Sequence, residues 1–246
     1  MNVAVIIPAA GLGTRMGKQS AEKTGTSRKQ FMLLEGSPIL LHTVRKFASC
    51  PLVTEIIVAL RADDLEWVTA MLELEEKSRI IRTVEGGNSR QESVLHALRA
   101  VAPGTDLVAV HDAVRPFVDL ETIEEAIHEA FHSGAAIVGI VPVDTVKQVT
   151  KGQGSGRAKI RGTIPREKLV LAQTPQVFRY ELLKQAFDSA NADGFIGTDE
   201  AALVERLENV EVTVVLGSDR NIKITKPSDM ALAHMLLEQE SARPLV

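Results

Sequence analysis

Glycines and a cation follow the first apolar run of the chain. The run from Val3 to Ile7 is typical of a short buried strand, and it leads directly into Pro8-Ala9-Ala10-Gly11-Leu12-Gly13-Thr14-Arg15-Met16. Glycine lets a backbone approach a ligand closely, and unpaired N–H groups along such a turn form an anion-binding concavity. The guanidinium of Arg15 adds a charge whose geometry suits phosphate. The segment therefore predicts a triphosphate cradle, with an ordinary turn as the alternative.

The glycine spacing does not match two common nucleotide motifs. A dinucleotide fingerprint needs a third glycine where Met16 stands, and Gly17 comes one position late. No acidic residue closes a second strand about 20 residues further on. The segment also lacks the Gly-Lys-Ser/Thr ending of a P-loop. These observations argue against a nicotinamide, flavin or P-loop protein.

Further residues that could bind a nucleotide come after later apolar runs. Asp112 follows the run 107–110, and a single carboxylate there can hold Mg²⁺ while nucleotide phosphates supply other ligands. A turn or helix-capping aspartate is the alternative. Arg115 could bind phosphate or anchor the turn. The pair Gly86-Gly87 could approach a base or ribose, and Ser93 could contact a ligand or fill space between helix and sheet.

Strands and helices that alternate along the chain must position these residues. Apolar runs predict strands at 3–7, 53–60, 80–84, 107–110, 135–141, 210–216 and 222–224. Periodicity and capping signals predict helices at 38–47, from Asp63-Asp64 to 76, up to 100, and at 120–132, 180–190, 200–207 and 227–240. Thr198-Asp199-Glu200 is expected to cap the sixth of these, and 169–178 returns the chain to the sheet.

Nearly continuous apolar strands with short connections indicate an α/β fold of the Rossmann-like kind. We expect one domain, 1–246, with a mostly parallel sheet and helices on both of its faces. Ligands of such sheets bind beyond the carboxyl ends of the strands. The glycine segment, Gly86-Gly87 and His111-Asp112 all fall there, so we expect them to share one site.

The pattern changes between about 143 and 166. Thr145 to Val149 and Lys159 to Thr163 alternate like half-exposed strands around a glycine-rich turn, which predicts a projecting β-hairpin arm. A hairpin alone is marginally stable. We therefore expect the arm to pack against a second copy of the chain in a homodimer.

Composition limits the remaining function classes. The chain has 246 residues and a net charge of −4, which argues against nucleic acid as its main partner. No apolar run approaches the roughly 20 residues of a membrane span, and no secretory signal pattern is evident. A single cysteine, Cys50, allows no disulfide within the chain and suits a reducing compartment. We expect a cytoplasmic protein that does not bind membranes.

Taken in order, the motifs resemble those of the 2-C-methyl-D-erythritol 4-phosphate cytidylyltransferases of the non-mevalonate isoprenoid pathway. The resemblance spans nearly the whole chain and is carried by Pro8-Ala9-Ala10-Gly11-x-Gly13-x-Arg15-Met16, Lys29-Gln30-Phe31, Gly86-Gly87-x-x-Arg90-x-x-Ser93-Val94, His111-Asp112-Ala113-x-Arg115-Pro116, Asp144-Thr145-x-Lys147, Thr174-Pro175-Gln176, Thr198-Asp199-Glu200 and Asp219-x-x-Asn221-Ile222-Lys223-Ile224-Thr225. It implies a homodimeric, Mg²⁺-dependent enzyme that joins CTP to methylerythritol phosphate and releases pyrophosphate.

The resemblance also implies roles for single residues. Arg15, Lys29 and Lys223 would be the catalytic cations, and Asp112 the Mg²⁺ ligand. The CTP contacts would be Ala9, Ala10, Gly11, Gly13, Gly87, Asn88, Ser93 and Ala113. The acceptor site would be shaped by Thr145, Arg166, Thr198, Asp219 and Arg115, with Thr145 and Arg166 serving the neighbouring subunit's site.

One segment departs from the family pattern. The spacer between Arg15 and Lys29 is longer than usual, and Arg28 stands where the family usually has proline. Lys18 or Lys23 could therefore compete with Lys29 for the phosphates. Lys29 is favoured because Gln30-Phe31 keeps its context. A ribitol 5-phosphate-type pentitol phosphate cytidylyltransferase and a non-catalytic nucleotide-binding module are the alternative functions.

Overall fold

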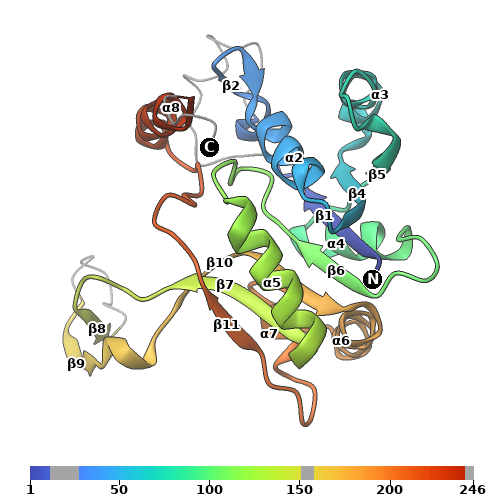
Figure 1. Cartoon of the computed structure of the whole chain (residues 1–246). Helices are drawn as coiled ribbons and strands as arrows, with labels where there is room; N and C mark the ends of the chain where they lie inside the picture. Colours follow the sequence, from blue (N-terminus) through green and yellow to red (C-terminus); the bar gives the residue numbers. More distant parts are fainter. Residues whose placement is uncertain (12–27, 151–157, 242–246) are drawn as a thin grey trace.

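A central sheet with helices on both faces makes up most of the molecule (Figure 1). The computed structural model describes residues 1–11, 28–150 and 158–241. In the described residues the sheet has seven strands in the order β11-β7-β10-β6-β1-β4-β5. Their bounds are β1 Val3–Pro8, β4 Val53–Leu60, β5 Ile81–Glu85, β6 Leu107–Val110, β7 Ala135–Ile140, β10 Leu171–Arg179 and β11 Thr213–Leu216.

The strands are parallel except for β10, which pairs antiparallel with both β6 and β7. This confirms the predicted Rossmann-like, mostly parallel sheet. The polarity of β10 lets the chain enter the sheet from the hairpin arm and continue directly into a helix. The carboxyl ends of β1, β4, β5 and β6 therefore lie along one edge, where a ligand site is expected.

Alternate residues of each strand supply two cores, one on each face. In β1, Val5 and Ile7 join the core under α2, α3 and α5, whereas Ala4 and Ile6 join the core under α4, α6 and α7. This is the period of two expected for a strand buried on both sides. The helices are α2 Ile39–Ser49, α3 Ala62–Glu73, α4 Arg90–Arg99, α5 Leu120–Ser133, α6 Tyr180–Asp193, α7 Ala201–Val204 and α8 Pro227–Ser241, with short 3₁₀ turns η2 Lys29–Phe31, η3 Ser78–Ile80 and η4 Arg166–Lys168.

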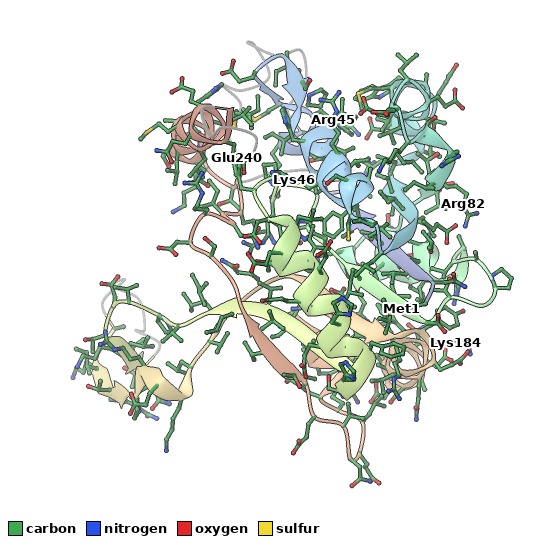
Figure 2. All side chains as sticks on the ribbon, viewed as in Figure 1. Met1, Arg45, Lys46, Arg82, Lys184 and Glu240 are labelled. Atoms are coloured by element: carbon green, nitrogen blue, oxygen red, sulfur yellow. The ribbon has the colours of Figure 1, made fainter. Side chains whose placement is uncertain are left out.

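A third, smaller core joins α8 to the hairpin formed by β2 (Leu33–Leu34) and β3 (Ser37–Pro38). It contains Leu34, Ile224 and Leu236. An ion pair from Lys46 of α2 to Glu240 of α8 (3.0 Å) ties the terminal helix to the body at the place labelled in Figure 2. This core links the segment after Lys29 with the segment after Lys223.

The predicted arm is present as a two-stranded antiparallel hairpin of β8 (Val146–Val149) and β9 (Ile160–Ile164). It projects away from the sheet (Figure 1). Among the helices of the described residues, none is long and apolar enough to cross a bilayer.

The helix predicted at 200–207 is shorter and spans Ala201–Val204, and two further element predictions are wrong. Residues 222–224 form no strand, because Ile224 makes a single ladder-like bond, from its N–H to Val114 O (2.9 Å), and its side chain enters the third core. Asp63 and Asp64 do not cap α3, whose N-cap is Arg61. Both acids lie in the first turn instead, and Asp64 is committed to a buried contact described below.

Candidate active site

A cavity of about 400 Å³ opens at the carboxyl edge of the sheet. It is lined by Pro8, Ala9, Ala10, Gly11, Lys29, Gln30, Arg61, Gly87, Asn88, Ser89, Arg90, Ser93, Asp112, Ala113, Val114 and Lys223. Every described residue that we expected to contact CTP or its metal borders this cavity. Four basic side chains and one carboxylate line it, and this excess of positive charge suits a polyanionic ligand.

The described start of the glycine segment is held by a buried amide. Gln30 is 2% exposed, and its Nε2 donates to Ala9 O (2.6 Å) and Gly11 O (3.0 Å). The N–H of Ala9 bonds to Ala59 O of β4 (2.8 Å). Gln30 thus donates both of its amide hydrogens to the backbone at the start of the glycine segment. This role of Gln30 was not predicted, because in the sequence Gln30 marks only the context of Lys29.

The residue that replaces the usual proline anchors the turn carrying Lys29. Arg28 forms an ion pair with Asp64, whose side chain is 2% exposed, and also lies 5.9 Å from the ring centroid of Phe31. Trp67 Nε1 donates to the other oxygen of Asp64 (3.3 Å) and its ring meets Phe31 edge-on at 4.7 Å. These four side chains, the Arg28 anchor, hold η2 against α3.

The loop after β5 approaches the glycine segment so closely that side chains do not fit. A Cβ on Gly86 would lie 2.8 Å from Ala10 Cβ, and one on Gly87 would lie 2.1 Å from Glu92 Cγ. Ser93 Oγ accepts from Gly87 N (3.1 Å) and donates to Ser89 O (2.8 Å). Ser93 therefore shapes this loop and also borders the cavity, and its contact with CTP stays a prediction.

The carboxylate of Asp112 lies among three cations. Arg90 Nε contacts Oδ1 at 3.2 Å, and Lys223 Nζ and Arg115 Nε contact Oδ2 at 2.8 and 3.4 Å. Burial alone would raise the pKa of Asp112, but Arg90 and Lys223 outweigh burial and hold it well below its usual range. Asp112 is thus an anion at any working pH.

His111 fixes the backbone around Asp112. The Thr174 hydroxyl accepts from Asp112 N–H (3.1 Å) and also contacts His111 Nδ1 (3.1 Å). Because the carbonyl of Arg115 can only accept, the proton of the neutral ring sits on Nε2, which donates to it (3.0 Å), and Nδ1 accepts from the Thr174 hydroxyl. Burial lowers the pKa of His111 to about 4, so the imidazole is neutral. His111 is a positioning group and not an acid or base for the reaction.

Three buried polar residues of β10 hold three different site segments. Gln173 holds the segment that precedes Lys223: it donates to Ser218 O (3.0 Å) and accepts from Asn221 Nδ2 (3.2 Å). Thr174 holds the turn of Asp112, as described. Gln176 donates to Asp199 Oδ2 (2.8 Å) and accepts from Ala201 N (3.0 Å). The register of β10 against β7 shifts between Ala172 and Gln176, which frees side chains for these contacts.

The donors of this cavity fit Mg²⁺ bound mainly by a substrate. The described residues contain no group of three or more acidic, histidine or cysteine side chains that could cage a metal. They do offer one ionised carboxylate, Asp112, at the cavity wall. One carboxylate plus substrate phosphates is a common arrangement for Mg²⁺. Lys223 would have to share Oδ2 or leave it.

Other predicted site residues lie outside the cavity wall. Arg115 lies behind Asp112 and donates to Asn221 O (2.6 Å). Thr198 and Asp219 are exposed on the loops before α7 and after β11, and Thr145 and Arg166 are exposed at the base of the arm. Gly13, Arg15, Lys18 and Lys23 lie outside the described residues, and the preference for Lys29 over Lys18 and Lys23 stays a prediction.

Arg61 and Arg90 line the cavity although no role was predicted for them. Arg61 follows β4 directly, so its place after a parallel strand was the available signal. Arg90 lies within a quoted motif, but its partner Glu200 is 110 residues away in sequence (2.7 Å). No local sequence pattern predicts the pairing of Arg90 with Glu200.

Comparisons with known proteins match nearly the whole chain to one family. The family model "IspD: 2-C-methyl-D-erythritol 4-phosphate cytidylyltransferase" matches residues 3–239. A protein of that name from Solibacter usitatus is 64% identical over 243 residues, covering 99% of this chain and 98% of the relative. The relative from Acidobacterium capsulatum, of the same name, is 51% identical and covers 99% and 100%.

Solved structures agree in fold. The 4-diphosphocytidyl-2C-methyl-D-erythritol synthase of Anaerococcus prevotii superposes with a TM-score of 0.82 at 29% identity, covering 96% of each chain. The 2-C-methyl-D-erythritol 4-phosphate cytidylyltransferase of Thermus thermophilus gives 0.74 at 32% identity, covering 97% of this chain and all of that one. With an ordered set of motifs, a shared fold and a full-length family match, this chain belongs to the 2-C-methyl-D-erythritol 4-phosphate cytidylyltransferase family.

Proposed function

We propose that the chain transfers CMP from CTP to 2-C-methyl-D-erythritol 4-phosphate, giving 4-diphosphocytidyl-2-C-methyl-D-erythritol and pyrophosphate. The observation that carries the proposal is the cavity at the sheet edge, where Lys29, Lys223 and Asp112 meet the start of the glycine segment. A cavity with this charge and this exposed backbone suits a triphosphate.

In the proposed reaction an oxygen of the acceptor phosphate attacks the α-phosphorus of CTP. The new P–O bond forms as the bond from the α-phosphorus to the bridging oxygen of pyrophosphate breaks. The acceptor phosphate is already a nucleophile, so no general base is needed. The protein's task is to neutralise charge and align the two anions for in-line displacement.

The described residues can supply these functions. Lys223 and Lys29 would neutralise charge on the phosphates, and backbone N–H groups of the glycine segment would hold the leaving pyrophosphate. Mg²⁺, held by Asp112 and the triphosphate, would add positive charge where negative charge develops. The loop formed by Gly86-Gly87 and the first turn of α4 would receive the nucleoside.

We further propose that the active form is a homodimer. Val143, Val149 and Ile160, in and beside the arm, are 82%, 51% and 66% exposed, which is unusual for aliphatic side chains unless another surface covers them. A second chain would cover them and receive Thr145 and Arg166 near its own cavity. The cytoplasmic location expected from the sequence stays a prediction.

A pyrophosphate-release assay with CTP and Mg²⁺ tests the reaction and its acceptor together. We expect turnover with methylerythritol phosphate, and a kcat/KM for ribitol 5-phosphate lower by at least 10²-fold, because a polar pocket rejects a wrongly placed hydroxyl. Preferred use of ribitol 5-phosphate would support the pentitol phosphate alternative. CTP binding without turnover on either acceptor would support a nucleotide-binding module.

A further inference from the structure

Two consecutive residues in the first turn of α4 hold the loop of residues 194–200, which joins α6 to α7. Gln91 uses both ends of its amide on this loop. Its Nε2 donates to Phe195 O (3.1 Å), and its Oε1 accepts from Gly197 N (3.0 Å). Only an amide side chain of this length offers a donor and an acceptor in that arrangement.

Arg90 holds the far end of the same loop. Its Nη1 donates to both carboxylate oxygens of Glu200 (2.7 and 2.9 Å), and its Nε contacts Asp112 (3.2 Å). Glu200 is 1% exposed, so its charge depends on this partner. Burial lowers the pKa of Arg90, but the carboxylates of Glu200 and Asp112 outweigh burial and raise it. The guanidinium therefore stays charged and joins the loop to the cavity wall.

These contacts flank Thr198 on both sides. Gln91 holds 195 and 197, Arg90 holds 200, and Gln176 of β10 holds Asp199 from the sheet side. The loop is also tightly packed, because a Cβ on Gly197 would lie 2.8 Å from Leu203 Cδ2. The helix that holds the loop is the one whose N-terminus, Asn88 to Arg90, borders the cavity.

We propose that Gln91 is a positioning residue for the acceptor substrate. It sets where Thr198 stands relative to the CTP cavity, so that α4 couples the nucleotide half of the site to the acceptor half. This inference rests on the proposed function, because it assigns the 194–200 loop to the acceptor side. Gln91 is half-buried and is not part of the cavity wall, so its substitution leaves the triphosphate contacts in place.

Steady-state kinetics of Gln91→Ala and Gln91→Glu separate this role from a purely structural one. We expect the acceptor KM to rise about tenfold in Gln91→Ala, since two hydrogen bonds are lost. Gln91→Glu should do no better, because its second oxygen faces the carbonyl of Phe195. The KM for CTP should stay within twofold in both. Gln185→Ala, an exposed glutamine on α6, is the matched control and should change neither constant.

Hydrogen–deuterium exchange of the substrate-free protein tests the same contact without turnover. The peptide covering 194–200 should exchange faster in Gln91→Ala than in the wild type, with other peptides unchanged. Unchanged exchange and an unchanged acceptor KM, or an equal rise in both KM values, would overturn the inference. A wild type that uses no polyol phosphate would refute the proposed function, while the exchange result would still report on the Gln91 contact.

Discussion

Lys223 and Asp112 form an ion pair in the cavity wall before any substrate is bound. The ammonium of Lys223 lies 2.8 Å from Asp112 Oδ2, and both side chains belong to segments that β10 holds through Gln173 and Thr174. A triphosphate entering the cavity brings negative charge to the same ammonium. Lys223 therefore pairs with Asp112 before the substrate binds. Once the triphosphate is bound, Lys223 also interacts with its negative charge.

We predict that Lys223→Ala lowers kcat by about 10²- to 10³-fold, the usual loss when one group aimed at transition-state charge is removed. Steady-state pyrophosphate release measures this. Lys226→Ala, an exposed lysine three residues later, is the matched control and should behave like the wild type. An equal, small effect of both variants would mean that Lys223 acts only as a surface charge.

The loop cation is tested in the same assay. We predict a similar loss of kcat for Lys29→Ala, because Lys29 borders the cavity on a turn that is anchored twice, by Gln30 and by the Arg28 anchor. Lys18→Ala and Lys23→Ala should retain near-normal kcat. The reverse pattern would transfer the role to one of those two lysines.

His111 makes the folded protein sensitive to acid. Its pKa falls from an ordinary 6.5 to about 4 on burial, so between these values the unfolded chain binds a proton that the folded chain excludes. The stabilising contribution of its neutral form is complete above pH 6.5. It is lost as pH falls towards 4, a change on the order of 3 kcal/mol.

Urea unfolding from pH 7.5 to 4.5 in EDTA measures this effect as a slope. We expect the free energy of unfolding of the wild type to fall more steeply with acid than that of His111→Gln, whose side chain does not titrate. A uniformly less stable variant still gives a valid slope. Parallel slopes would show that the imidazole is not held neutral.

At the scale of elements, the family's usual proline is replaced by Arg28, which holds the turn of Lys29 by an ion pair to α3. Among the described residues, the removal of Arg28 leaves the buried Asp64 carboxylate with Trp67 as its one side-chain partner, and breaking such a buried ion pair typically costs about 3 kcal/mol. We predict this loss for Arg28→Met in urea unfolding, together with a several-fold higher KM for CTP. The double variant Arg28→Met/Asp64→Asn removes the unpaired charge. It should recover most of the stability but not the KM, whereas recovery of both would mean that Lys29 needs no anchor.

Elements that are specified locally were predictable, and elements specified by distant partners were not. The ends of β4 and β6 match the predicted apolar runs, because a buried parallel strand is encoded by its own residues. The antiparallel direction of β10 follows from its neighbours in the sheet. Asp64 gave the local signal of a helix cap, but a buried contact with Arg28, 36 residues away, determines its position.

In the site, too, locally encoded residues were predictable and residues that depend on distant partners were not. Lys29, Lys223, Gly11 and Gly87 were visible as parts of motifs, and all four border one cavity. The residues that hold them, Gln30, Thr174 and Glu200, have polar side chains that sequence reasoning places on the surface. They are buried here because each satisfies backbone or charged groups from another segment. Such pairings depend on the folded arrangement and leave no spacing pattern.

At the scale of the whole molecule, the proposed dimer predicts that two inactive variants complement each other. Arg166→Ala leaves the cavity of its own chain intact, and Lys223→Ala leaves the arm intact. In a mixed dimer, one cavity then has its lysine and receives an intact arm from the other chain. Re-equilibrated equimolar mixtures should regain about a quarter of the wild-type activity, since half the dimers are mixed and each has one working site. No recovery, with mixed dimers shown by native mass spectrometry, would mean that each arm serves its own chain.

The most direct test of the whole account follows the bond that is made. Methylerythritol phosphate labelled with ¹⁸O in its phosphate is incubated with CTP, Mg²⁺ and the wild-type protein, and the products are analysed by mass spectrometry. Attack on the α-phosphorus predicts 4-diphosphocytidyl-2-C-methyl-D-erythritol that keeps all the label, together with unlabelled pyrophosphate. Formation of CDP together with the diphosphate of the acceptor, which attack on the γ-phosphorus would give, or the absence of any cytidylyl product, would contradict it.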